Sequence, residues 1–209
     1  MGKGTFILNL KSHIILANHT ADIIEDQIDI KLDRDTLELG AVYPDLHIRK
    51  RVRIHNLKQV YNNYFMQTEN IINKNKNKWG ISFSLGMLSH YVCDSFCLAH
   101  NMKMRSINDF KVHRRYENKL SEVVHSYKLD DNVKHRINEN FERCMDFDIY
   151  DFLGETQTGY IQNANFKTFE NQYNKDIEHS IFCSAIVMVG FIYELEKAQS
   201  PAVEILYTL

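Results

Sequence analysis

Apolar residues recur along this chain at helical rather than strand spacing. Within residues 6–26, for example, Ile7, Leu10 and Ile14 follow the 3.6-residue period of an amphipathic helix. The same kind of pattern predicts further helices over 57–72, 79–102, 131–145 and 169–198, and another after a turn at 106–109. Because there is no internal repeat, the helices are expected to pack as one bundle rather than as a repeat array.

Turn-forming and polar residues mark the expected ends of helices and the loops between them. Asp33 or Asp35 could cap a short helix that is expected to end at Gly40. Pro44 disfavours helical geometry in the residue before it, so Asp45 is predicted to lie on a turn. The polar segments 73–78 and 151–166 are predicted to be loops.

Composition supports an all-α protein. With 8 Gly and 2 Pro in 209 residues, the chain has few of the signals that separate strands. Its length and its 44% hydrophobic residues suit a single compact multi-helix domain over residues 1–209. A formal net charge of -2 gives no overall basicity that would favour nucleic acid as a partner.

Two apolar segments bear on where in the cell the protein is found. The apolar run FILNL is too short for a signal peptide, and 181–195 is shorter than the roughly 20 residues of a spanning helix. We therefore expect a cytoplasmic protein with no transmembrane segment, in which 181–195 is a buried helix. In that compartment the four cysteines are expected to be reduced thiols.

Candidate metal ligands are concentrated in residues 86–117. His90 and Asp94 are four residues apart, and so are His113 and Glu117, with His100 between the pairs. Residues four apart lie on the same face of a helix, so each pair can reach one ion. Imidazole with carboxylate is a common ligand set for zinc.

The candidates continue toward the N-terminus in a recognisable order. They are His13, Asp45 within GAVYPD, His55, and then the segments HYVCD, AH and HRRYE that contain the five ligands above. This order resembles the zinc-dependent phospholipase C family, mostly α-helical bacterial enzymes whose fold is shared with fungal single-strand-specific nucleases. The resemblance covers roughly the first 120 residues.

The resemblance implies how the ligands divide between zinc ions. The residues implied for one zinc are His55, His90, Asp94 and Asp45. Those implied for a second zinc are His100, His113 and Glu117. A third zinc would take His13 and a bridging Asp94, together with an N-terminal amine and carbonyl that Met1 or Gly2 could supply. Asp45 would also lie beside the metal-bound water as ligand, general base or both.

Other polar residues have simpler interpretations. The histidines without a ligand in the motif order are taken as packed or surface residues: His19, His47, His125, His135 and His179. Cys93 and Cys97 could form a thiolate site with His100, although buried packing is favoured. The cations of 49–53, with Arg114 and Arg115, are either a solvated face or a steering site for a phosphate substrate.

These observations predict a zinc-dependent phosphoester hydrolase that resembles phospholipase C. Its substrate would be a phosphoester, with phospholipid as one candidate. One alternative is a nuclease-like phosphodiesterase, for which an aromatic base-stacking pocket would be evidence. Another is a non-catalytic, metal-stabilised protein with a closed coordination shell. An HD-type phosphohydrolase fits less well, because the chain has no adjacent His-Asp pair.

Overall fold

A computed structural model describes residues 5–47, 57–74, 78–103, 105–141, 148–165, 169 and 171–198. These residues form helices and no strand, so the predicted all-α class is confirmed. The helices are α1 Thr5–Ile28, α2 Arg34–Leu46, α4 Leu57–Lys74, α5 Lys78–Ser95, α6 Leu98–Asn101, α7 Ile107–Ser126, α8 Asp131–Phe141, α9 Ile149–Gln162 and α10 Gln172–Lys197. That the whole chain forms one domain stays a prediction.

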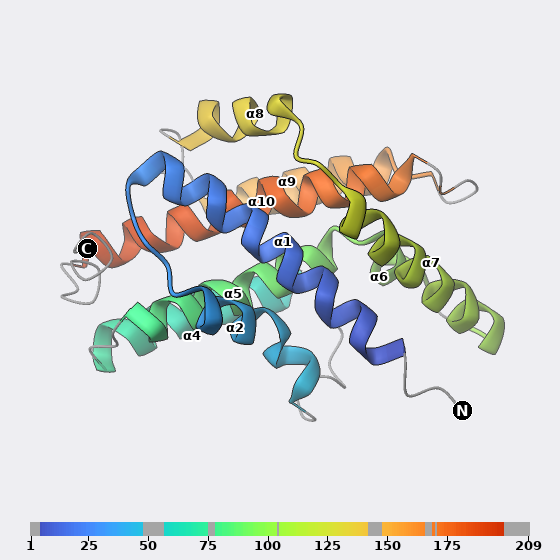
Figure 1. Ribbon diagram of the computed structural model, residues 1–209, viewed down its shortest axis with the longest axis horizontal. Helices are drawn as coiled ribbons and strands as arrows, with labels where there is room; N and C mark the ends of the chain where they lie inside the picture. Colours follow the sequence, from blue (N-terminus) through green and yellow to red (C-terminus); the bar gives the residue numbers. More distant parts are fainter. Residues whose placement is uncertain are drawn as a thin grey trace.

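Helix α10 forms the centre of the core and runs across most of the molecule (Figure 1). It contacts α1, α4, α5, α7, α8 and α9. By length and composition alone it could cross a membrane, since an 18-residue window has a mean hydropathy of 1.4. However, 83% of that window is buried inside the protein, as in a core helix. The predicted buried helix at 181–195 is therefore confirmed.

Two glycines allow α2 and α5 to approach closely. A Cβ atom on Gly40 would lie 2.1 Å from the Phe83 carbonyl oxygen, and one on Gly86 would lie 2.1 Å from the Leu37 carbonyl oxygen. Real Cβ atoms essentially never make such short contacts, so only glycine fits at either position. This crossing positions Asp45, at the end of α2, beside the ligands of α5.

The predicted end of the second helix was wrong. Asp33 does cap α2, accepting a hydrogen bond from the Thr36 N–H at 2.9 Å. The helix then passes Gly40 and includes Pro44, so Asp45 lies in its last turn rather than on a turn outside it. Gly40 serves the contact with α5 instead of a helix end, and packing along that contact overrides the local preferences.

The predicted helix over 79–102 is two helices. α5 ends at Ser95, and Cys97 adopts an extended conformation before the short helix α6. The Leu98 N–H at the start of α6 donates to the buried carboxylate of Asp176 on α10, at 2.8 Å. This break turns His100 toward the ligands of α5 and α7.

The predicted loop at 151–166 was also wrong, because most of it is helix α9. The Asp148 side chain caps this helix by accepting from the Tyr150 N–H at 2.7 Å. Leu153 and Tyr160, two turns apart, are buried on one face. The polar residues between them lie on the other faces and conceal the amphipathic pattern in the sequence.

Candidate metal centre

Five helices bring seven of the eight predicted ligands to one place. In chain order the residues are His13 on α1, Asp45 on α2, His90 and Asp94 on α5, His100 on α6, and His113 and Glu117 on α7. The eighth, His55, lies outside the described residues, as do the cations of 49–53 and the first two residues. The ligand groups thus lie between helices.

Asp94 lies at the middle of this arrangement and is almost fully buried, with 4% of the residue exposed. Its Oδ1 atom is 3.4 Å from His13 Nε2 and 3.4 Å from His100 Nε2. Its Oδ2 atom is 3.3 Å from His90 Nε2. One carboxylate therefore contacts histidines from three helices, as a bridging ligand would.

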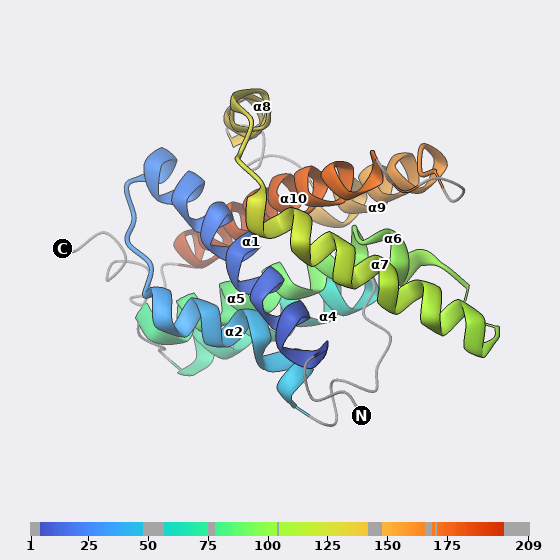
Figure 2. The ribbon, with the colours of Figure 1, turned by 45° about the vertical axis from the view of Figure 1, so that its right-hand side comes forward.

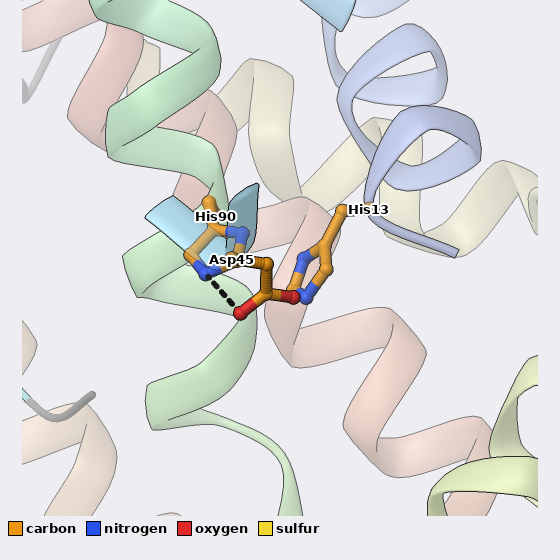
Figure 3. Close-up of side chains that lie close together, drawn as sticks. All are labelled: His13, Asp45 and His90. Atoms are coloured by element: carbon orange, nitrogen blue, oxygen red, sulfur yellow. Dashed lines mark ion pairs between the residues drawn. The ribbon is translucent and has the colours of Figure 1, made fainter. Parts of the chain in front are cut away.

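One group of ligand atoms gathers on the α1, α2 and α5 side of Asp94. Nitrogen or oxygen atoms of His13, Asp45 and His90 all lie within 4.8 Å of one another. Figure 3 shows the three side chains converging, with His90 Nε2 3.8 Å from Asp45 Oδ1. His13 lies in one group with Asp45 and His90, and it also contacts Asp94, the residue with which the resemblance places it at a third ion.

A second group lies on the other side of Asp94. Ligand atoms of His100, His113 and Glu117 also lie within 4.8 Å of one another. Glu117 Oε1 is 3.2 Å from the Nε2 atoms of both histidines. These residues come from α6 and α7, which run side by side (Figure 2).

The spacings suit ligands of a shared ion. Two atoms bound to a tetrahedral zinc at about 2.0–2.1 Å lie roughly 3.3–3.4 Å apart. The contacts of Asp94 and Glu117 with the histidines are 3.2–3.4 Å long. Charge-assisted N–H···O hydrogen bonds are shorter, about 2.7–2.9 Å. The described residues therefore suit ligands of a shared metal ion, because several such contacts converge on Asp94 and on Glu117.

Backbone carbonyls fix the tautomer of two histidines. His90 Nδ1 lies 2.8 Å from the Ala41 oxygen, and His113 Nδ1 lies 2.9 Å from the Ala99 oxygen. A carbonyl oxygen only accepts, so Nδ1 carries the hydrogen in both rings. In the neutral ring Nε2 then has a free lone pair directed into the cluster, which is the form that binds metal.

The negative charges of the carboxylates favour a positive charge at the second group. Burial lowers the pKa of His100, but the charges of Asp94 and Glu117 outweigh this and raise it to about 9. Burial raises the pKa of Glu117, but the adjacent imidazoles of His100 and His113 outweigh this and lower it to about 2. A divalent cation would supply the same positive charge without a proton on His100.

A cavity of about 390 Å³ reaches these ligands. His13, Asp45, Asp94, His100, His113 and Glu117 all contribute to its lining. Aliphatic side chains such as Leu16, Val124 and Ile177 line it together with polar ones such as Ser12 and Ser180. Phe110 and Arg114, in the N-terminal half of α7, also line the cavity. The cluster is thus accessible to a small molecule.

The cysteines fit the packing interpretation rather than a thiolate site. Cys93 and Cys97 are buried, with 3% and 6% exposed. Burial raises the pKa of the Cys93 thiol to about 12, and it also raises that of Cys97. Zinc binds the thiolate form, which this burial disfavours. Neither sulfur joins a ligand group among the described residues.

Asp176 on α10 is a residue of the site that the sequence analysis missed. Its buried carboxylate accepts hydrogen bonds, each 2.8 Å long, from the Leu98 N–H, the Tyr116 and Tyr160 hydroxyls and the Gln172 amide. It thereby ties the start of α6 to α7 beside Glu117. A sequence signal existed, because Asp176, Ser180 and Ser184 form a polar stripe on an apolar helix.

Fold and site together define an all-α protein with histidine and carboxylate ligands gathered from five helices. Residues 12–167 match the family described as zinc dependent phospholipase C, and all eight predicted ligands fall within that range. The chain belongs to the zinc-dependent phospholipase C family, so the predicted resemblance is confirmed. This membership supports a zinc-dependent phosphoesterase as the general class of activity. Neither a curated protein nor a solved structure matches the chain.

Proposed function

We propose that the protein hydrolyses phosphoesters with a pair of zinc ions held by the two ligand groups. His13, Asp45 and His90 would hold one ion, and His100, His113 and Glu117 the other, with Asp94 between them. When bound, zinc supplies Lewis acidity and lowers the pKa of water. The observation that carries the proposal is the contact of Asp94 with histidines on both sides.

Within this proposal Asp45 is the residue suited to take a proton from water. Its side chain keeps 24% exposure and lines the cavity, whereas that of Asp94 keeps 6% and is enclosed by histidines. A general base must be within reach of both water and substrate. Asp94 is better placed to hold the histidine ligands than to exchange protons.

The cavity favours a phosphoester with an apolar substituent, such as a phospholipid. Beyond the ligands, the lining is mixed, and it includes aliphatic side chains such as Leu16, Val124 and Ile177 that suit a hydrocarbon group. A nuclease would be expected to stack bases on several aromatic rings. Histidines aside, Phe110 is the aromatic side chain among the described lining residues. The access to the ligands favours an enzyme over a purely metal-stabilised protein.

An activity panel with zinc-loaded protein tests the proposal. The substrates are phosphatidylcholine, single-stranded DNA and a water-soluble chromogenic phosphodiester. Asp45→Asn is expected to weaken zinc binding and, at a zinc concentration that keeps the site loaded, to lower turnover of the chromogenic diester by a factor on the order of 10²–10⁴, as expected for loss of a general base. Zinc-loaded wild-type protein that cleaves none of the three would refute the proposal.

A matched pair of variants separates the metal site from ordinary surface chemistry. His135 and Glu139 form an exposed i,i+4 pair on α8, 3.3 Å apart, that copies the spacing of His113 and Glu117. Glu117→Gln is expected to lower both zinc content and turnover, whereas Glu139→Gln changes neither. Equal effects of the two substitutions would show that the pair on α7 has no special role.

A further inference from the structure

Two large apolar side chains are exposed at the start of α7. Ile107 has 79% of its surface exposed and Phe110 has 51%. They are three residues apart and therefore lie on the same face of the helix, which Lys111 and Arg114 share. A continuous exposed patch of this kind needs an explanation, because single apolar residues are common on surfaces but clustered ones mark interaction sites.

Cations surround this patch. The side chains of Lys103, Arg105, Lys111 and Arg115 are exposed, and Arg114 is half-buried. Between residues 103 and 115 the chain has five Lys or Arg side chains and one carboxylate, that of Asp109, although the whole chain has a net charge of -2. We call the side chains of Lys103, Arg105, Ile107, Phe110, Lys111 and Arg115 the α7 tip.

The α7 tip is continuous with the cavity of the metal centre. Phe110 and Arg114 both line that cavity, and Arg114 Cζ lies 5.9 Å from the centre of the Phe110 ring. The N-terminal end of α7 also projects beyond the neighbouring helices in both views (Figures 1 and 2). A planar partner that contacts the α7 tip would therefore lie beside the cavity that leads to the metal ligands.

We propose that the α7 tip docks on an anionic lipid surface. Ile107 and Phe110 would enter the boundary between headgroups and acyl chains, while the cations would lie among the lipid phosphates. Nucleic acid would also attract the cations, but Ile107, the most exposed large apolar side chain among the described residues, has no ring on which a base could stack. The docking deepens the proposed function, because it would bring a lipid phosphoester to the cavity.

Vesicle sedimentation with the zinc-loaded chain of residues 1–209 tests the docking. Vesicles of phosphatidylcholine alone are compared with vesicles that also contain phosphatidylglycerol, at low and high salt. We expect tighter binding to the anionic vesicles, weakened by salt. Ile107→Ser and Lys111→Glu are each expected to weaken this binding roughly ten-fold or more. Turnover of the water-soluble chromogenic diester should be unchanged in both variants.

Trp79→Ser is the matched control, since Trp79 on α5 is 60% exposed but lies outside the α7 tip. It should leave vesicle binding unchanged. Equal binding to both kinds of vesicle, or an equal loss in Trp79→Ser, would overturn the docking. Binding to single-stranded DNA that Lys111→Glu weakens, without vesicle binding, would assign the tip to nucleic acid instead.

The two assays fail independently. Turnover of the chromogenic diester without vesicle binding would refute the docking and leave the phosphoesterase standing. Vesicle binding that depends on Ile107 and Lys111, without turnover of any substrate, would refute the phosphoesterase and leave the docking standing.

Discussion

The substitution Gly86→Ala tests the close helix contact that positions the site. The new Cβ atom would lie 2.1 Å from the Leu37 carbonyl oxygen and 2.8 Å from the Ala41 nitrogen. Both neighbours are backbone atoms, which cannot move aside by changing rotamer. An ordinary contact begins at 3.4 Å, so α2 and α5 would have to separate by roughly 1.3 Å at this point.

The energetic cost follows from two opposed effects. Overpacking of a core typically costs about 1–3 kcal/mol, and a backbone clash belongs at the upper end of that range. Replacing glycine by alanine inside a helix stabilises the folded state by about 0.5–1 kcal/mol, which offsets part of this cost. We therefore expect a loss of about 2 kcal/mol in the free energy of unfolding, or roughly a 30-fold change in the equilibrium.

Urea denaturation measures this loss, with Gly159→Ala as the control. Apart from the local backbone of α9 itself, no atom of the described residues lies within 4 Å of the position that a Cβ on Gly159 would occupy, so this variant should be stabilised by up to about 1 kcal/mol. Zinc affinity should fall only in Gly86→Ala, because moving α2 displaces Asp45 and the Ala41 carbonyl from His90. A stabilised Gly86→Ala variant would refute the close contact.

Three further outcomes are expected. Asp176→Asn should weaken zinc binding roughly 10–100-fold in a competition titration, since it loosens the start of α6 behind His100; unchanged affinity would contradict that role. In the presence of a chelator, the Tm of the metal-free protein should fall as the pH rises from 6.5 through about 9, because the pKa of His100 in the folded protein is raised to about 9. The variant His100→Gln should flatten this profile of Tm against pH. Zinc at 100 times its Kd should stabilise the fold by about 2.7 kcal/mol, seen as a higher Tm that a chelator abolishes.

The helices and the ligand pairs could be predicted because they depend on local spacing. His90 with Asp94, and His113 with Glu117, share a helix face whatever the rest of the chain does. The place of His13 could not be found in this way. It lies 77 residues before His90, and its inclusion rested on the family resemblance rather than on a spacing rule.

Two of the errors arose where distant parts of the chain decide the local structure. The break before α6 depends on Asp176, which accepts the Leu98 N–H from a helix 78 residues away. The extension of α2 beyond Gly40 depends on its contact with α5, and Pro44 is accommodated there. Such contacts override propensity and cannot be read from neighbouring residues.

The zinc content of the folded chain tests the central claim most directly. Protein saturated with zinc and freed of excess metal by gel filtration is analysed by mass spectrometry of the metal, for the wild type and for Asp94→Asn. We expect two zinc ions per chain in the wild type and fewer in the variant, with the helical circular dichroism signal retained. One ion or none in the wild type, or an unchanged content in Asp94→Asn, would contradict a centre bridged by Asp94.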